Sequence, residues 1–312
     1  MATQIVVAPV HDVSTVPSRG ERRDSGPAWG LLAPFTVLYV AFLIVPTVYG
    51  LVMSFFDTSL VRPGLSGFAG LGNYGAVLTS ADFWASMWHT VLFTLLTTPP
   101  LVVIALVLAI LTDRLRRGRW FFRLVFFAPF VVPVSVAGLV FAWLYAPEIG
   151  LYGTWLTALG LPTPGWLSDP AWSVPGVALL TVWWTLGFNF VLYLAGLQDI
   201  PRDVYEAASI DGAGPWARMW RITVPMLRRT TVLILVLQIV ASLKVFGQIY
   251  SLFNGASGPD NAARPVLQFI LDTGFTDYRA GYGAAASMVY LALVVLVAIV
   301  WFLVSRRLTR RA

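Results

Sequence analysis

Cysteine is absent from this 312-residue sequence, which excludes disulfides, thiol catalysis, iron–sulfur clusters and cysteine-based zinc fingers. Charged residues are also scarce, at 12% against about a quarter in soluble proteins. The two histidines, His11 and His89, lie far apart and have no carboxylates near them in the apolar stretches, so we expect no metal site and no cofactor. With 58% hydrophobic residues and a mean hydropathy of +0.76, the chain is expected to have the membrane as its solvent.

The basic balance does not indicate nucleic acid. The net charge is +6 and the pI is near 9.8, but the arginines are scattered between apolar runs. A single-strand binder needs a basic groove interleaved with aromatic side chains, and no such pattern is present. We therefore expect no nucleic-acid partner.

Six stretches with at most one charged residue are long enough to cross a bilayer, which takes about 20 apolar residues. They predict an all-α membrane protein with six transmembrane helices at about 30–55, 84–111, 122–146, 174–197, 229–252 and 282–304. Pro129 and Pro133 are expected to kink the third helix and to open room near the membrane midplane. Gly281, Gly283 and the alanines at 284–286 predict a face of the sixth helix that packs tightly.

Lysine and arginine accumulate in the cytoplasmic loops of membrane proteins, and here their distribution is one-sided. Seventeen arginines lie in the N-terminal tail, the 112–123 loop, the 199–230 segment and the C-terminus, against three in the remaining loops. The asymmetry predicts that both termini and the 199–230 segment are cytoplasmic. The outer loops are then about 56–83, 147–173 and 253–281, and they are rich in turn-forming and interfacial aromatic residues.

The polar segment Asp199–Thr230 interrupts this apolar chain between the fourth and fifth predicted spans. We predict two short helices: Asp199 caps the first, with Pro201 in its first turn, and Gly212 ends it in a left-handed conformation. Pro215 opens the second helix. A basic segment of this kind can be a mere topology anchor, but about 30 residues with two capped helices exceed what a connection needs and favour a docking surface.

The residues of this segment also resemble a known family. They are similar to the signature loop of ABC importer permeases, the binding-protein-dependent transport inner-membrane components. The matching parts are Glu206-Ala207-Ala208, then Gly212 after three intervening residues, and the I-x-x-P pattern that ends at Pro225. Within that family the sequence looks like the maltose, glycerol-3-phosphate and multiple-sugar permeases. Weaker matches in the same order lie at 70–74, 123–145, 194–201, 243–250 and 281–288, so the resemblance runs from about 30 to 305.

The resemblance implies that the 199–230 segment couples the chain to a cytoplasmic ATPase. Glu206 would contact the ATPase, Ala207 and Ala208 would allow close approach, and Asp211 and Gly212 would form the turn that follows. The chain itself lacks a phosphate-binding P-loop, because its single lysine, Lys244, has leucine before it and valine after it. ATP is therefore expected to be hydrolysed by a partner chain.

Four residues are candidates for a substrate pathway: Asn189, Lys244, Gln248 and Tyr250. Lys244 is a charge inside a predicted span, and on a continuous helix it shares a face with Gln248. It can line the pathway, pair with a buried or partner-subunit group, or snorkel outward. Asn189 can bind substrate or make the more common interhelical hydrogen bond.

These observations predict a non-catalytic permease subunit of the bacterial plasma (inner) membrane that takes up a sugar or related polyol. Its expected parts are a disordered cytoplasmic tail (1–28), a six-helix permease domain (29–305) and a basic C-terminus (306–312). Its expected partners are a second homologous permease, a cytoplasmic ABC ATPase dimer and an extracytoplasmic solute-binding protein. The alternatives are an ATPase-independent secondary transporter or channel, and a membrane enzyme, for which the scattered acidic residues offer no cluster.

Overall fold

The computed structural model describes residues 25–61, 64–115, 117–147 and 149–309, with side chains between residues 30 and 303 of these ranges. Most of the predicted N-terminal tail and the last three residues of the predicted basic C-terminus lie outside the described residues. Within the described ranges every regular element is a helix, apart from an isolated bridge between Phe56 and Phe68, so the all-α prediction is confirmed.

The helices, with the π-helical or 3-10 turns labelled η, are α1 (Ser25–Tyr39), η1 (Val40–Ile44), α2 (Val45–Met53), α3 (Gly72–Leu78), α4 (Ala81–Asp113), α5 (Arg119–Val131), α6 (Val134–Leu144), α7 (Leu151–Ala158), α8 (Pro170–Gln198), α9 (Arg202–Ile210), α10 (Pro215–Arg218), η2 (Met219–Thr223), α11 (Val224–Met226), α12 (Arg228–Leu243), α13 (Gly247–Leu252), η3 (Pro259–Asn261), α14 (Val266–Leu271), η4 (Asp272–Thr276) and α15 (Ala280–Thr309).

The chain forms two compact units, residues 1–49 and residues 50–312. The described part of the first unit is a nearly continuous apolar helical run made of α1, η1 and the start of α2. Its side chains from residue 30 onward are almost all exposed. An apolar helix with an exposed surface is what a segment solvated by lipid requires, because lipid tails are as apolar as the side chains.

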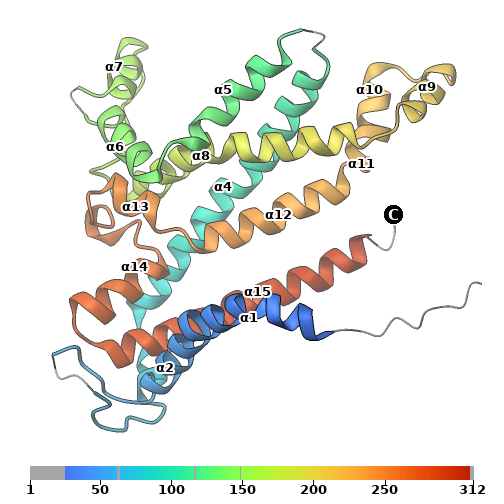
Figure 1. Ribbon diagram of the computed structural model, residues 1–312. Coiled ribbons are helices and arrows are strands. Elements are labelled where there is room, and N and C mark those ends of the chain that lie inside the picture. The colour runs from blue at the N-terminus through green and yellow to red at the C-terminus, as the bar shows by residue number, and fades with distance from the viewer. Residues whose placement is uncertain (1–24, 62–63, 116, 148, 310–312) are drawn as a thin grey trace, which may run out of the picture. The chain divides into compact units, whose positions relative to one another are not determined.

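The second unit is built around α4 and α8, which pack along each other (Figure 1). Helix α5 packs on α8, α12 packs on α4, and α15 packs on α3 and α14. Three clusters of buried apolar side chains hold these helices together. The first joins α4, α6, α8 and α13, the second joins α4, α8 and α12, and the third joins α3, α4, α14 and α15.

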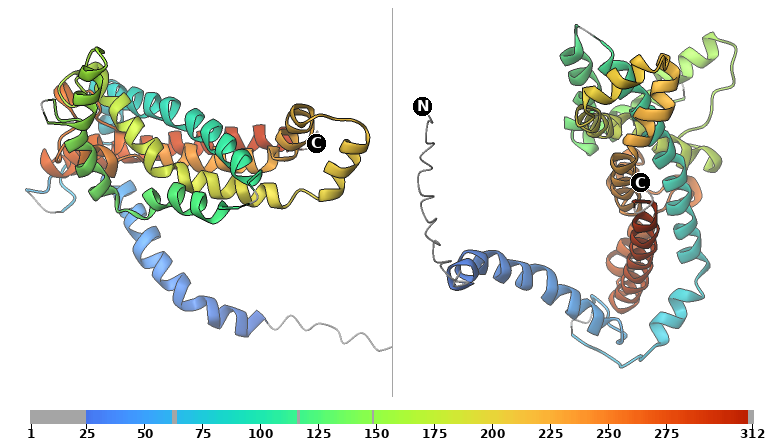
Figure 2. Two further views of the ribbon diagram at one scale, coloured as in Figure 1. Left: turned by 90° about the horizontal axis from the view of Figure 1, so that it is seen from above. Right: turned by 90° about the vertical axis from the view of Figure 1, so that its right-hand side faces the viewer.

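The short helices of the second unit gather at two opposite ends of the long ones. Helices α9, α10 and α11 lie at the end where α8 stops and α12 starts, while α6, α7 and α13 lie at the other end of α8 (Figures 1 and 2). Local sequence sets the starts of the two longest inner helices. The Ser80 hydroxyl accepts from the Phe83 amide at 3.3 Å, and the Asp169 carboxylate accepts from the Ala171 amide at 2.9 Å.

By length and composition, four described helical stretches could cross a membrane: Gly30–Met53, Ala81–Asp113, Pro170–Gln198 and Ala280–Leu303. Two bent pairs raise the number to six if each pair is one span. In the first pair α5 and α6 meet at 95°, with Pro133 at the break, so the predicted proline kink is confirmed. In the second, residues Pro215–Met226 meet α12 at 57°.

The fifth predicted span is wrong in its extent. A continuous helix over 229–252 was expected from the apolar run, but α12 ends at Leu243 and α13 starts only at Gly247. Between them Phe246 has φ −156° and ψ −60°, which is not helical. The break buries Val245 in the first cluster while the neighbouring Lys244 stays exposed.

The glycines predicted to allow tight packing in the sixth helix do so. A Cβ on Gly281 would lie 2.0 Å from the Phe56 carbonyl oxygen, and one on Gly283 would lie 2.8 Å from the Gly274 Cα. Ala285 and Ala286 are fully buried in the third cluster. The prediction of a small-residue packing face on α15 is confirmed.

Candidate functional site

The 199–230 segment folds as a helical hairpin, hereafter the α9–α11 hairpin, that joins the end of α8 to the start of α12. Its two arms are α9 and the helical run 215–226, which starts at Pro215 as predicted. The predicted cap is wrong: Asp199 ends α8, and Pro201 stands at the N-cap of α9 without a side-chain cap. Asp199 lies two residues before the N-cap position, because α8 runs on to Gln198.

Gly212 ends α9 as expected. Its φ is +75°, the Gly212 amide donates to the Ser209 carbonyl at 3.1 Å, and the Ala213 amide donates to the Ala208 carbonyl at 2.9 Å. This left-handed turn satisfies the last carbonyls of α9 and reverses the chain. Because a left-handed φ disfavours residues with a Cβ, glycine is required here for conformational reasons.

Two side-chain contacts tie the arms of the hairpin together. The Tyr205 and Thr223 hydroxyls lie 3.0 Å apart, and an Arg218 Nη1 donates to the Ser209 hydroxyl at 2.8 Å. Leu227 is buried at the base of the hairpin in the second cluster. The hairpin is therefore a braced element anchored in the helical core rather than a slack connection.

The exposed face of α9 carries most of the predicted coupling residues. Glu206 and Ala207 are exposed on α9, and Asp211 and Gly212 are exposed in the turn, whereas Ala208 is buried within the hairpin. Asp203, one turn before Glu206, is exposed on the same face.

Sequence reasoning missed one large member of this face. Ile210 follows Glu206 by one turn, and its side chain is 87% exposed. The signal was available, because an isoleucine four residues after Glu206 in an amphipathic helix shares its face.

A central cavity of about 280 Å³ lies between α4, α5, α8, α12 and α13. Aromatic side chains form part of its wall, with the Phe130 ring 5.2 Å from Phe188 and 5.6 Å from Trp184. Its remaining lining is hydroxyl, amide or aliphatic: Phe93, Thr97, Thr181, Thr185, Leu237, Gln238, Ala241, Ser242 and Gln248. None of these lining side chains carries a charge.

The cavity is small but close to the lower end of the range of about 300–1,000 Å³ typical of small-molecule pockets. Aromatic faces beside hydroxyl and amide groups can hold an uncharged polar solute, with the rings packing on C–H surfaces and the amides directing hydrogen bonds. The kink at Pro133 shapes one side, since the Trp184 indole donates to the Val132 carbonyl at 2.8 Å.

The four predicted pathway residues are separated by the structure. Gln248 lines the central cavity. Asn189 is fully buried, and its Oδ1 accepts from Gln238 Nε2 at 2.8 Å, so it makes the interhelical hydrogen bond that was the alternative to substrate contact. It reaches the cavity only through Gln238, which lines it.

Lys244 and Tyr250 do not line the central cavity. Lys244 is the C-cap residue of α12 and is exposed. Because the helix is broken between Lys244 and Gln248, these two residues do not share a helical face as predicted. The Tyr250 ring lies beyond the same break and stacks on Phe246 at 5.2 Å.

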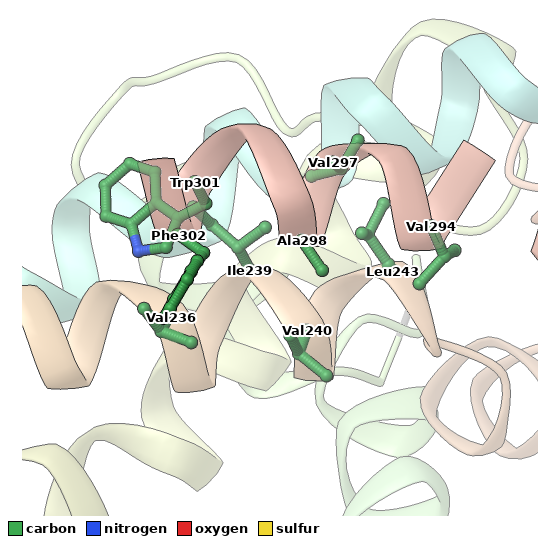
Figure 3. Close-up of a pocket in the computed structure, with 9 residues that line it drawn as sticks. All are labelled: Val236, Ile239, Val240, Leu243, Val294, Val297, Ala298, Trp301 and Phe302. Atoms are coloured by element: carbon green, nitrogen blue, oxygen red, sulfur yellow. The ribbon is translucent and has the colours of Figure 1, made fainter. Parts of the chain in front are cut away.

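A second hollow, of about 190 Å³, lies between α12 and α15 and is lined by Val236, Ile239, Val240, Leu243, Val294, Val297, Ala298, Trp301 and Phe302 (Figure 3). Its walls are aliphatic and aromatic, which suits contact with lipid or another apolar helix and not the binding of a polar solute. It is therefore not a second candidate for the solute site.

Residues 68–310 match the family described as "binding-protein-dependent transport system inner membrane component". The chain belongs to this family.

Curated relatives of this inner-membrane component agree along nearly their whole length. The chain is 34% identical over 276 residues to the sulfoquinovosyl glycerol transport system permease protein SmoG of Agrobacterium fabrum, covering 88% of this chain and 89% of SmoG. It is 31% identical over 293 residues to the trehalose/maltose transport system permease protein MalF of Thermococcus litoralis, covering 93% and 97%.

Solved structures share the fold of this inner-membrane component. A chain of a bacterial ABC transporter involved in the import of the acidic polysaccharide alginate superposes with a TM-score of 0.78 at 22% sequence identity, covering 91% of this chain and 96% of that one. The same match holds for that transporter in complex with its alginate pentasaccharide-bound periplasmic protein.

Proposed function

We propose that this inner-membrane component forms half of the translocation pathway of an ATP-driven importer for an uncharged sugar or related polyol. In this proposal the six predicted spans cross the membrane with both termini and the α9–α11 hairpin on the cytoplasmic side. The bent pair of α5 and α6 serves as the third span, and α12 with the short helix α13 serves as the fifth. A second permease and a pair of ATPase subunits complete the transporter, and this chain catalyses no covalent step.

The proposal rests mainly on the direct connection of the α9–α11 hairpin to two helices of the central cavity. Helices α8 and α12 both line the central cavity, and the α9–α11 hairpin connects these two helices directly. The buried hydrogen bond between Asn189 and Gln238 ties α8 to α12 beside the cavity. A force on the hairpin would thus reach both cavity walls through helices rather than through loops.

The exposed face of α9 suits a protein partner. Glu206 and Asp203 supply carboxylates, and Ile210 supplies an apolar anchor one turn away. Exposed apolar residues rimmed by charge are typical of docking sites. We propose that the ATPase receives Ile210 in an apolar pocket and meets Glu206 with a basic or hydrogen-bonding group.

The proposed substrate class rests on the cavity and on the relatives. The printed names of SmoG and MalF give a sulfoquinovosyl glycerol and trehalose or maltose as transported compounds, and an arabinooligosaccharide permease of Bacillus subtilis is 32% identical to this chain over 270 residues. Each of these compounds has several hydroxyl groups. The uncharged aromatic and amide lining of the central cavity favours the uncharged members of this class.

The opposite end of the second unit is where an extracytoplasmic binding protein would dock. There Arg264 bonds the 253–281 region to the start of α4: its Nε donates to the Ser86 hydroxyl at 3.3 Å, and its Nη2 lies 3.8 Å from Asp82. Phe275 and Tyr278, in the same region, expose large aromatic surfaces. Firmly held loops with exposed aromatic side chains suit a partner that binds and leaves in each cycle.

The test is reconstitution of the chain with its partner permease, ATPase and binding protein. Glu206→Ala and Ile210→Ala should each lower solute-dependent ATP hydrolysis and uptake about tenfold or more. Loss of a charge-assisted contact at Glu206 costs about 1.5–3 kcal/mol. Loss of a buried isoleucine side chain costs about the same. Arg117→Ala, which removes an exposed charge from the 112–123 loop and lies outside both α9 and the 253–281 region, serves as control and should transport normally. Normal ATP-driven uptake by both α9 variants, or solute flux with no ATPase present, would overturn the proposal.

A further inference from the structure

Two adjoining hollows lie between the end of α4 and the second arm of the α9–α11 hairpin. One is polar and measures about 460 Å³, and the other is apolar and measures about 330 Å³. Ile110, Arg114, Pro215 and Met219 line both, so the two form one continuous groove that changes from polar to apolar along its length.

The polar hollow has an excess of positive charge. Arg114 and Arg218 line it together with Asp113, and Asp113 is already paired with Arg119 at 3.8 Å. Arg218 is held by the neutral Ser209 hydroxyl, which leaves its charge uncompensated. Within the described part of the chain, the Arg114 guanidinium makes no hydrogen bond or ion pair. Two guanidinium groups therefore face one hollow without a carboxylate of their own, and guanidinium groups bind phosphate strongly.

The apolar hollow has the surface expected at a membrane interface. Leu106, Val107 and Leu111 of α4 form one wall, at the end of a helix long and apolar enough to span a membrane. The opposite wall carries Trp216 and Trp220, whose side chains are 73% and 60% exposed. Tryptophan at this depth is typical of residues that anchor a protein among lipid headgroups.

We propose that this groove binds one anionic glycerophospholipid of the cytoplasmic leaflet. Its phosphate lies between Arg114 and Arg218, and the start of an acyl chain lies in the apolar hollow between α4 and the two tryptophans. This assignment rests on the proposed cytoplasmic placement of the α9–α11 hairpin.

The combination of a polar and an apolar hollow in one groove favours an anionic phospholipid over other occupants. Free phosphate would satisfy the two arginines and leave the apolar hollow empty, whereas a neutral lipid would leave the arginines without a counter-ion. A phospholipid with net negative charge fills both hollows and matches the charge of a basic site at the cytoplasmic surface.

The bound lipid would brace the hairpin. Pro215, Trp216 and Met219 belong to the arm that meets α12 at 57°. A lipid wedged between this arm and α4 resists movement of the arm toward α4. Coupling between the ATPase and the helices is then expected to depend on anionic lipid.

The experiment uses the assembled transporter in detergent, titrated with dioleoyl phosphatidylglycerol and, separately, dioleoyl phosphatidylcholine, with retained lipid counted by native mass spectrometry. The double variant Arg114→Ala/Arg218→Ala should weaken phosphatidylglycerol retention about tenfold or more, because two charged hydrogen-bonding partners are lost. Arg117→Ala is the matched control, since Arg117 is exposed in the same loop and lines neither hollow, and it should retain lipid like the wild type. The double arginine-to-lysine variant should keep most of the preference for phosphatidylglycerol and thereby separates loss of charge from misfolding.

Three results would overturn the proposal: equal retention of the two lipids by the wild type, unchanged phosphatidylglycerol retention in the double alanine variant, or displacement of the lipid by millimolar inorganic phosphate. The readout needs neither ATP nor solute. A failure here therefore leaves the uptake results with Glu206→Ala standing, and a failure of uptake leaves the lipid count interpretable.

Discussion

A close approach between α5 and α8 in the second unit gives a sharp test of the packing. Gly187, in the middle of α8, faces the backbone of α5. A Cβ placed there would lie 2.0 Å from the Phe126 carbonyl oxygen and 2.6 Å from the Phe127 Cα. Both are backbone atoms, so no side chain can rotate away, and Gly187→Ala must push α5 from α8.

The expected cost follows from that overlap. Overpacking a well-packed core typically costs about 1–3 kcal/mol, and a clash with backbone belongs at the upper end. At about 2–4 °C per kcal/mol for a chain of a few hundred residues, the apparent Tm should fall by about 5–10 °C. The loss arises beside the aromatic wall of the central cavity, because α5 also carries Phe130.

A matched control lies in the same helix. A Cβ on Gly176 would meet its nearest neighbours, on Trp166 and Tyr145, at 3.5 Å, which is ordinary contact. Gly176→Ala should therefore leave the Tm of the detergent-solubilised protein within about 2 °C of the wild type, helped by the better helix propensity of alanine. The two variants and the wild type would be compared by size-exclusion chromatography after heating. If Gly187→Ala is as stable as Gly176→Ala, α5 and α8 do not approach as described.

Three further predictions concern the 253–281 region, the buried amide pair and the hairpin base. Burial raises the pKa of Asp272, while Arg264 opposes the shift and Asp277 adds to it. A carboxyl group whose pKa is raised in the fold costs no stability well below its unfolded pKa. The cost grows as pH rises from the unfolded pKa to the folded pKa and is complete above it, so Asp272→Asn should raise the Tm at pH 8 and much less at pH 4. Asn189→Ala should cost about 1 kcal/mol by stranding the Gln238 amide, and Asn189→Leu/Gln238→Leu should cost less, as measured by chemical or thermal unfolding in detergent. A Cβ on Gly196 would lie 2.5 Å from the Thr230 hydroxyl oxygen. Because the chain has no cysteine, the variant Gly196→Cys/Thr230→Cys should form a single disulfide on mild oxidation. After proteolytic cleavage between α8 and α12, the two fragments should separate on a gel only when a reducing agent is added.

Much of the fold could be predicted because its signals are local. The uncharged stretch between Asp169 and Asp199 predicts a spanning helix at about 174–197, and α8 covers that range from Pro170 to Gln198. Gly212 and Pro215 fix the hairpin because each allows or enforces a backbone conformation by itself. These properties belong to single residues and need no knowledge of what packs against them.

The central cavity could not be predicted because its walls come from five helices far apart in the sequence. Composition marks Lys244 as the unusual residue of its apolar stretch, but whether a charge lies in a helix depends on where that helix ends. Helix α12 ends at Leu243, and the nearby residue that could mark this end in the sequence is Gly247. Gly247 lies close to α6: a Cβ placed on it would lie 3.3 Å from the Val134 side chain. Only the tertiary neighbour distinguishes this break from the many glycines that leave a membrane helix intact.

The break between α12 and α13 also determines how a movement of the α9–α11 hairpin would reach the central cavity. Helix α12 ends at Leu243, so a displacement of its hairpin end is carried along its 16 residues, roughly 24 Å at 1.5 Å per residue, past Gln238, Ala241 and Ser242 in the cavity wall, and stops at Leu243. Beyond the break, Val245 and Ile249 are held in the first buried cluster with α6. A continuous helix through residue 252 would drag that cluster along with every movement of the hairpin. With the break, α12 can tilt against α13, and Gln248 on the far side of the hinge can move away from Gln238 on the near side. The cavity then changes shape where the two amides face it, which is where an uncharged hydroxylated solute would be bound or released.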